Sequence, residues 1–338
     1  MRDLEQLYDA LATPTPAVEQ DLSELGGDLV IIGVAGKLGP EMAIMAARAL
    51  RAVNSSSRVI GVARNASVDL VQRLSSEGVV MEEADLSHPD ALRALPDAAA
   101  VVYLAGRKFG TTGDEPGTWL INTYLSGRVA ERYAGAAIVA FSTGNVYPLL
   151  PVVSGGATES TIPAPVGEYA ASALGRERVM AAICERSDTP LSLLRLNYAV
   201  EMRYGVLLEI ARDVWHERPI DVTNGAVNVI WQGDVNAAAL RSIRRARCPA
   251  QTWNITGPET LSVRSVAARF GELMGRTPQI VGTESPDALL SNAGRYFKEF
   301  GYPTVAVEQL IDWTAGWVAA DLPTHDKPTH FATRDGRF

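Results

Sequence analysis

The sequence predicts an α/β fold built on a parallel sheet, and three observations support that prediction. Residues 29–32 form an unbroken apolar run, typical of a strand that is buried on both faces. Glycines follow at a three-residue spacing, at Gly33, Gly36 and Gly39, and an alanine-rich helical pattern begins at Pro40. Further apolar runs then alternate with helical patterns, which indicates βαβ units. We therefore expect a Rossmann-type doubly wound parallel sheet with a smaller C-terminal α/β substrate lobe.

The remaining elements follow from the same two periodicities. Strands of the sheet are expected at 58–63, 79–83, 99–104, 137–141 and 191–196, with a short strand at 253–255. Helices are expected at 3–11, 40–53, 67–78, 118–133, 167–184, 206–217, 234–245, 263–274 and 305–318. These elements suggest three parts: an N-terminal helical extension at 1–26, a dinucleotide-binding domain at 27–197, and a lobe at 198–338 with segments that return to the sheet. The extension is expected to cover a sheet edge or to join a subunit contact.

Composition limits the class of protein. The chain has 338 residues, 47% of them apolar and 21% charged, with a net charge of −8, which argues against a nucleic-acid or anionic-membrane binder. No run approaches the roughly 18 apolar residues of a membrane span, and the first residues lack a signal-peptide core. Cys184 and Cys248 fit neither a metal site nor a disulfide framework, and the four histidines show no ligand spacing. The expected setting is the cytoplasm, with a small-molecule substrate and no metal.

The glycine-rich turn predicts a phosphate site. Glycines allow backbone N–H groups to approach an anion, and the dipole of the following helix favours it. Lys37 lies inside this turn, where it could reach a pyrophosphate or a 2′-phosphate, or simply be solvated. The carboxyl ends of parallel strands share one edge of a sheet, so we also expect Arg64, Asp85, Gly106 and Thr143 near the turn.

Several motifs, taken in order, resemble the extended short-chain dehydrogenase/reductases, the epimerase/dehydratase group. The resemblance spans about residues 28–320. The motifs are Gly33-Val-Ala-Gly36-Lys-Leu-Gly39, Ala84-Asp85-Leu86, Tyr103-Leu104-Ala105-Gly106, Asn122, Ser142-Thr143-Gly144-Asn145-Val146-Tyr147, Tyr169-Ala-Ala-Ser172, Arg195-Leu196-Asn197, Gly233-Asp234-Val235 and Trp253-Asn254-Ile255-Thr256-Gly257.

The resemblance implies a nicotinamide dinucleotide as cofactor. An acidic residue at the end of the second strand usually binds the ribose in members that use NAD. Here Ala63 takes that place and Arg64 follows, so NADP is the first choice and NAD the second; Arg64 could instead stack on adenine and take either. The implied cofactor-binding residues are Gly33, Gly36, Lys37, Leu38, Gly39, Arg64, Asp85, Leu86, Leu104, Ala105, Gly106, Asn122, Tyr169 and Asn197.

By the same resemblance, Tyr169 is the acid/base and Thr143 binds the same substrate oxygen. The lysine that the family places four residues after the tyrosine is Ala173 here. We expect Lys108, after the fourth strand, to replace it. Arg176 lies two helical turns beyond Tyr169, about 10 Å along the axis, and is expected to be too distant. A neutral tyrosine that only donates a hydrogen bond is the third alternative.

Two further departures concern the reaction and the substrate. Gly144 and Asn145 replace an acidic pair found in sugar dehydratases, which disfavours dehydration. Val227 replaces an arginine that grips a diphosphate, which favours a free sugar, sugar acid or lactone rather than a nucleotide-diphosphate sugar. The expected substrate-binding residues are Lys108, Asn145, Asn197 and Arg203, although Arg203 could equally be a surface residue.

The sequence thus predicts an NAD(P)-dependent oxidoreductase or epimerase. The alternative is a dinucleotide-binding sensor or scaffold with weak turnover. By resemblance we expect a homodimer through a four-helix bundle formed by residues 118–133 and 167–184. Small residues at Ala170, Ala171, Ala173 and Gly175 would allow close packing there.

Overall fold

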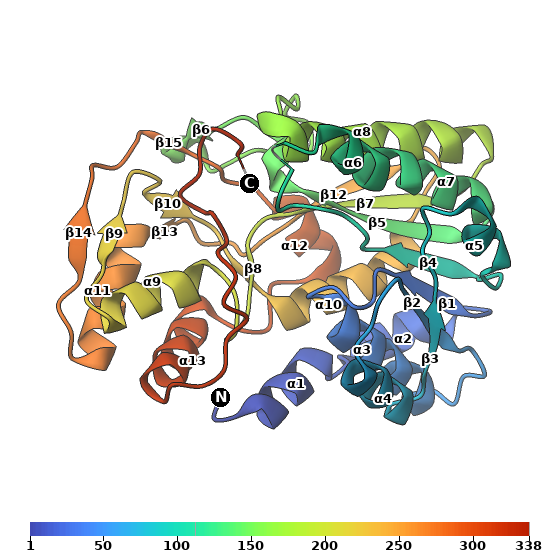
Figure 1. Cartoon of the computed structure of the whole chain (residues 1–338), viewed down its shortest axis with the longest axis horizontal. Helices are drawn as coiled ribbons and strands as arrows, with labels where there is room; N and C mark the ends of the chain where they lie inside the picture. Colours follow the sequence, from blue (N-terminus) through green and yellow to red (C-terminus); the bar gives the residue numbers. More distant parts are fainter. Residues whose placement is uncertain (112, 338) are drawn as a thin grey trace.

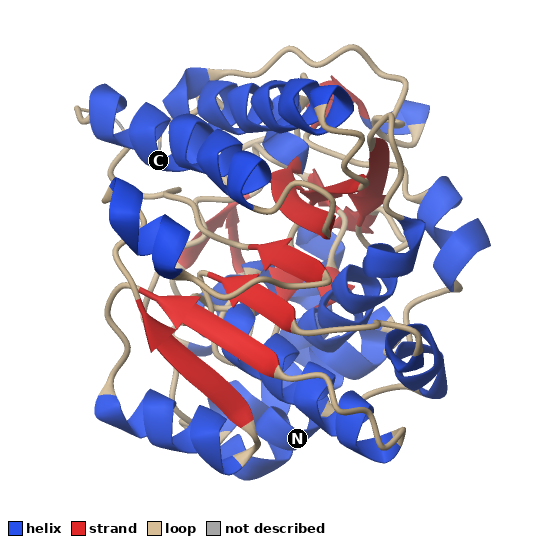
Figure 2. Cartoon of the chain, turned by 90° about the vertical axis from the view of Figure 1, so that its right-hand side faces the viewer, coloured by secondary structure: helices blue, strands red, loops and turns tan. Residues whose placement is uncertain are grey.

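The computed structural model describes residues 1–111 and 113–337. A seven-stranded sheet runs through one half of it, with strand order β12-β7-β5-β4-β1-β2-β3, and every neighbouring pair in that sheet is parallel. Helices cover both faces, so this half has three layers (Figures 1 and 2). The strands are β1 (Leu29–Ile32), β2 (Val59–Ala63), β3 (Val79–Glu83), β4 (Ala100–Tyr103), β5 (Ala137–Thr143), β7 (Leu191–Leu196) and β12 (Gln251–Ile255). The doubly wound parallel sheet is confirmed.

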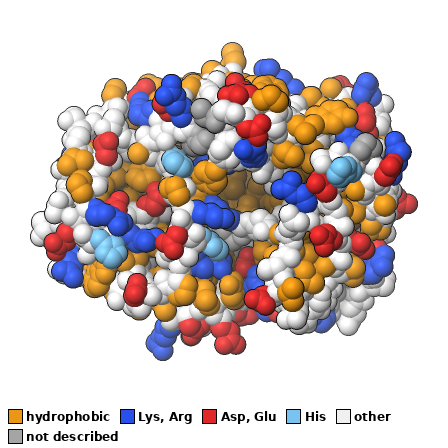
Figure 3. Space-filling model, viewed as in Figure 1, with side chains coloured by type: hydrophobic (Ala, Val, Ile, Leu, Met, Phe, Trp, Pro, Cys, Tyr) orange, Lys and Arg blue, Asp and Glu red, His pale blue; other side chains and the backbone are white. Residues whose placement is uncertain are grey.

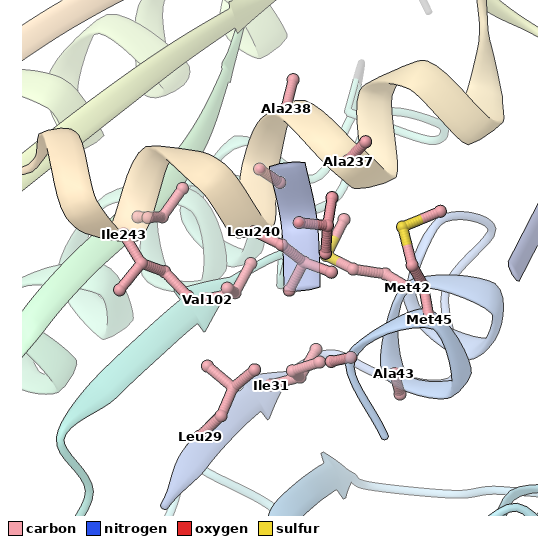
Figure 4. Close-up of a cluster of buried hydrophobic side chains, with 14 of the residues drawn as sticks. Leu29, Ile31, Met42, Ala43, Met45, Val102, Ala237, Ala238, Leu240 and Ile243 are labelled. Carbon is pink, nitrogen blue, oxygen red and sulfur yellow. The ribbon is translucent and has the colours of Figure 1, made fainter. Parts of the chain in front are cut away.

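Strand β1 shows why the core has two sides. Leu29 and Ile31 pack into one buried cluster, and Val30 and Ile32 pack into another on the opposite face. Successive side chains of a strand point to opposite faces, so an unbroken apolar run is needed where helices cover both. Figure 4 shows part of the first cluster, where β1 and β4 meet helices α3 and α10.

One face of the sheet carries α3 (Gly39–Ala52), α4 (Val68–Ser76) and α10 (Gln232–Ser242), and the other carries α5 (Pro89–Ala94), α7 (Leu125–Arg132) and α8 (Gly167–Arg186). Helix α7 continues α6 (Glu115–Trp119) through a π-helical segment at Leu120–Tyr124. The sequence predicted a single helix over 118–133 here. Because β12 and α10 both return to the sheet half, segments late in the chain complete its core.

The N-terminal extension forms α1 (Leu4–Ala12) and α2 (Pro16–Ser23), capped by the side chains of Asp3 and Thr15. Both helices pack on α3 and α10. The extension therefore covers helices of the outer layer. The expectation that it covers a sheet edge is wrong, because the edge strands are β3 and β12.

The second half of the molecule is a lobe of short strands and helices (Figure 1). It contains β8 (Ala199–Val200), α9 (Val206–Trp215), β9 (Pro219–Asp221), β10 (Ala226–Val227), β11 (Ile230–Trp231), β13 (Leu261–Ser262), α11 (Val263–Met274), β14 (Gln279–Val281) and α13 (Val307–Ala319). The strands β6 (Leu150–Pro151) and β15 (Asp287–Ala288) pair with each other, and α12 (Gly294–Phe300) packs near β12. Helices α9, α11 and α13 pack on one another around a separate buried cluster. The domain limits given above stay predictions.

After α13 the chain has no further helix or strand within the described residues. We call residues 321–337 the tail. It runs across the front of the molecule, past β8, and ends beside α8 and β15 (Figure 1). It therefore lies over the space between the sheet half and the lobe.

No helix of the described chain is long and apolar enough to cross a membrane.

Candidate active site

The glycine turn joins β1 to α3 at the carboxyl edge of the sheet. Gly33 has a φ of +86°, and a Cβ there would lie 2.8 Å from the backbone nitrogen of Ala105. A Cβ on Gly39 would collide with the carbonyl of Val34. Leu38 precedes α3 and gives it no side-chain cap, so the first-turn N–H groups other than that of Pro40, which has none, lack a capping side chain. This cradle fits the diphosphate of a dinucleotide.

The next strand ends bring Arg64 and Asp85 together. Arg64 is exposed, and its charge helps to lower the pKa of Asp85, although hydrogen bonds from Ser87 are the larger cause. Leu86 beside them is buried, while Leu104 and Ala105 are half-buried at the end of β4. A cation, a carboxylate and an apolar floor are the groups that an adenosine end would meet.

A cavity of about 200 Å³ lies at the end of β5 and contains the predicted catalytic pair. Thr143 is the last residue of β5 and Tyr169 lies in the first turn of α8, and their side chains are hydrogen-bonded. Both donors of Asn145, its backbone N–H and its side-chain amide, point to Thr143 Oγ1, at 3.2 and 2.9 Å. The threonine hydroxyl therefore has its own proton left to donate to the phenol oxygen of Tyr169. The structure thus brings the two residues together, and their roles toward a substrate oxygen stay predictions.

Burial raises the pKa of Tyr169, while the hydrogen bond from Thr143 and the charge of Arg176 act in the opposite direction. The nearby cation is thus Arg176, which the sequence argument set aside as too distant. Helical side chains point back toward the N-terminus, and the long arginine side chain covers most of the two turns. That expectation is wrong because it compared positions along the axis rather than the reach of the guanidinium.

Arg176 is held by backbone carbonyls. Its Nε donates to the carbonyl of Asn122 at 2.9 Å, and its Nη1 donates to the carbonyl of Phe141 at 2.6 Å. Gly106 is needed above it, because a Cβ there would lie 2.7 Å from the Nη2 of Arg176. The guanidinium is therefore fixed between β5, the π-helical segment and the loop after β4.

Asn122 lies in the π-helical segment, completely buried. Its amide donates to Ser172 Oγ and to the carbonyl of Arg107, both at 2.9 Å, and its Oδ1 accepts from the backbone N–H of Arg107. A π turn shifts the side chains that follow it, and such turns often occur at functional sites. Here it places Asn122 beside Arg176 and the loop after β4.

Lys108 lines the same cavity as Tyr169, and its ammonium donates to the carbonyl of Thr329 in the tail at 3.0 Å. Burial lowers the pKa of Lys108 to about 8. The structure thus brings Lys108 to the site and ties it to the tail. Its support of Tyr169 stays a prediction.

Two other predicted substrate-binding residues, Asn197 and Arg203, lie in different environments. Asn197 lines the cavity and donates from its amide to Asn228 Oδ1 at 2.7 Å. Arg203 is buried beside Glu201 and lies over the ring of Tyr8, so its reading as a surface residue is wrong. Nothing in the sequence indicated that α1 lies next to Arg203.

Several lining residues were missed. Tyr198 lies between β7 and β8, and Tyr204 lies between β8 and α9. Gln232 comes from the start of α10 and Thr329 from the tail. Tyr198 stood beside Asn197 in a matched motif, so it could have been proposed. Nothing in the irregular tail sequence signalled that it returns to the cleft.

The described residues contain no group of three or more histidine, cysteine, aspartate and glutamate side chains that could hold a metal.

Comparison with known proteins shows the fold. No protein-family model and no curated sequence matches the chain. Among similar solved structures, MoeE5 in complex with UDP-glucuronic acid and NAD has a TM-score of 0.70 at 20% identity, covering 88% of this chain and 100% of that one. UDP-glucose 4-epimerase from Thermotoga maritima with UDP-glucose gives 0.70 at 15%, covering 87% and 99%. dTDP-glucose 4,6-dehydratase from Bacillus anthracis with NAD gives 0.72 at 16%, covering 87% and 97%. The chain therefore shares the fold of these three structures.

These structures overturn one expectation. These proteins are named for, or hold, UDP-glucuronic acid, UDP-glucose and dTDP-glucose. The preference for a small substrate rather than a nucleotide-diphosphate sugar is therefore wrong. The physical reason lies at Val227, which is fully buried in the core of the lobe. A residue packed in that core does not determine which groups face the cleft. Other cations lie in the cleft.

Proposed function

We propose that the chain is an NAD(P)-dependent enzyme that acts on a hydroxyl or carbonyl carbon of a nucleotide-diphosphate sugar, as an epimerase or oxidoreductase. The observation that carries this proposal is the hydrogen-bonded pair of Tyr169 and Thr143, in a cavity that Lys37 of the glycine turn also lines. A bound nicotinamide would supply the hydride chemistry.

In this proposal Tyr169 exchanges a proton with the sugar oxygen. Thr143 donates a hydrogen bond to the phenol oxygen, which stabilises the phenolate that forms when Tyr169 acts as a base. Asn145 fixes the orientation of the threonine hydroxyl through its two hydrogen bonds. Arg176 is a positioning residue whose charge favours the same phenolate. Since Asn145 carries no carboxylate, dehydration is not part of the proposal.

Arg64 supports NADP as the first choice of cofactor, because an exposed guanidinium at the end of β2 suits a 2′-phosphate. Asp85 beside it could bind ribose hydroxyls, which keeps NAD as the second choice.

We also propose that the protein forms a homodimer. A groove of about 440 Å³ runs between α6–α7 and α8, and Tyr124 on its rim is 58% exposed.

Small residues of α8 allow close packing within the chain. Ala170 and Ala173 are 0% and 2% exposed, and a Cβ on Gly175 would lie 2.9 Å from Thr123 Oγ1 of the same chain. Their part in packing across a dimer stays a prediction.

The test is turnover with defined cofactors and substrates. The purified protein is incubated with NAD or NADP and UDP-glucose, UDP-glucuronic acid or dTDP-glucose, while reduced cofactor is followed by absorbance and sugar products by NMR. We expect conversion of at least one substrate, and a loss of about 10²-fold or more in Tyr169→Phe. Cofactor binding without any turnover would overturn the proposal and support a dinucleotide-binding sensor.

A further inference from the structure

A second cavity, of about 870 Å³, adjoins the one that holds Tyr169, and Lys37 and Lys108 line both. Lys327 of the tail lines the second cavity as well. The chain has only four lysines, so three of them lie around one cavity. Two of its four histidines, His325 and His330, lie there too. Figure 3 shows basic side chains gathered around the hollow in the middle of this face.

Arginines rather than lysines hold the carboxylates near this cavity. Glu41 accepts from Arg73 at 3.0 Å, and Glu201 accepts from Arg203 at 3.1 Å. A second nitrogen of Arg73, Nη1, is buried with no hydrogen-bond partner within residues 1–111 and 113–337. A buried donor of this kind costs free energy unless an acceptor reaches it.

The charged side chains around Lys37 have a net effect of positive charge on it. Burial lowers the pKa of Lys37 to about 7, and the charges of Lys108 and Lys327 lower it more than those of Glu201 and Glu209 raise it. Gathering like charges in a half-buried space is unfavourable, and an anion among them would relieve that cost.

We propose that Lys37, Lys108 and Lys327 form one site for a phosphate group of a ligand whose reacting end lies beside Tyr169. This inference rests on the proposed function and deepens it, since it assigns a tail residue to the site. Gly36 of the glycine turn lines the same cavity, so a diphosphate there could belong to the dinucleotide or to the sugar nucleotide.

The tail is built to hold Lys327 in place. The backbone N–H of His325 donates to the carbonyl of Arg203 at 3.0 Å, and Thr329 Oγ1 donates to Glu209 at 2.7 Å. Asn224 Nδ2 donates to the carbonyl of Phe331 at 2.7 Å. The lysine is thus anchored on both sides before any ligand arrives, which lowers the entropy cost of binding.

The first test measures binding alone, by calorimetry, with inorganic pyrophosphate, UDP, NAD and NADP as probes. Lys327→Met is compared with wild type and with Lys298→Met, which removes the exposed lysine of α12. We expect Lys327→Met to weaken pyrophosphate by about 10-fold or more, the loss of one charge-assisted contact, and Lys298→Met to have no effect. Lys327→Arg should recover most of the affinity.

The organic probes identify the source of the phosphate. If Lys327→Met binds UDP more weakly but NAD and NADP as tightly as wild type, the site belongs to the substrate. If it binds NAD and NADP more weakly but UDP as tightly, the site belongs to the cofactor. Equal affinities of all four probes for Lys327→Met and Lys298→Met, in variants with unchanged thermal unfolding, would overturn the site. Because these probes need no turnover, the result is independent of the Tyr169→Phe assay.

The second test uses pH, with inorganic sulfate as a probe whose own charge is constant from pH 7 to 9. Lys37 is faced by Lys108 after β4, Lys327 of the tail, Glu209 of α9 and Glu201 after β8. Lys37 and Lys108 lose protons as the pH rises, so sulfate should bind more weakly at pH 9 than at pH 7. Lys37→Met should flatten this dependence, and the same steep fall in Lys37→Met would count against the site.

Discussion

The most direct test of the structure is the removal of one partner of a buried ion pair behind the active site. Arg195 on β7 and Glu177 on α8 have side chains only 9% and 5% exposed. Arg195 donates to both carboxylate oxygens, at 2.6 Å from Nη2 and 2.9 Å from Nε, and its Nη1 donates to the Tyr147 hydroxyl at 2.8 Å. Ser142, next to Thr143, donates to the same carboxylate at 2.5 Å. The network therefore ties β5, β7 and α8 together where the catalytic pair is held.

The magnitude follows from burial. Replacing Arg195 by Met leaves the buried carboxylate of Glu177 with the hydrogen bond from Ser142 but without its cation, and breaking such a pair costs about 3–5 kcal/mol. The matched control is the pair of Arg264 and Glu284, whose side chains are 48% and 37% exposed. An exposed pair contributes about 0–1 kcal/mol, so Arg264→Met should change little.

The assay is denaturant unfolding of the full chain, followed by fluorescence and circular dichroism. Arg195→Met and Glu177→Leu should each lower the free energy of unfolding by several kcal/mol. The double variant should lose much less than the sum of the two, because no unpaired charge remains. If Arg195→Met costs no more than Arg264→Met, the reasoning about this network is refuted.

Four further predictions concern the site and the assembly. Arg64→Ala should weaken the binding of NADP by about 1.5–3 kcal/mol in a titration and leave the binding of NAD nearly unchanged. Equal losses of affinity for both cofactors would refute a contact between Arg64 and the 2′-phosphate. Arg176→Met should shift the pH profile of alcohol oxidation upward, because the pKa of Tyr169 rises without the cation, and Arg176→Lys should shift it less; an unchanged profile would remove Arg176 from the mechanism. Lys108→Ala should cut turnover by about 10²-fold, with partial rescue by Ala173→Lys, if Lys108 supports the tyrosine, whereas a rise in KM alone would indicate substrate binding. Tyr124→Asp should convert a dimer to monomers in light scattering, and a wild-type monomer at micromolar concentration would count against the dimer.

The sheet could be predicted because the pattern of residues within each segment is enough to indicate a strand. An apolar run buried on both faces needs no distant information, so the strand at Leu191–Leu196 was placed at its observed bounds. The edge strand at Val79–Glu83 was also placed at its observed bounds, although only Val79 in it is buried. Helix α11 likewise begins after its capping residue, Ser262, as predicted. The glycine turn followed from its spacing, whereas Thr143 and Tyr169 were chosen because their motifs resemble those of the dehydrogenase/reductases.

What could not be predicted depends on contacts between distant segments. The role of Arg176 depends on where a long side chain ends, which its position on the helix does not give. The burial of Arg203 depends on α1, and the π turn at Asn122 shows no distinct periodicity in five residues. Lys327 lies in a segment with no helix or strand, so only the folded chain brings it beside Lys37.

The tail also sets an order for synthesis. Residues 325–331 follow every other element of the two cavities along the chain, while the glycine turn and the first strands precede nearly all of them. Chains fold largely from the N-terminal side as they leave the ribosome. The sheet half can therefore fold before residues 325–331, which carry Lys327 and Thr329, have been made. A ligand of this site cannot help the nascent sheet to form; it can only stabilise a chain that is already complete to residue 331.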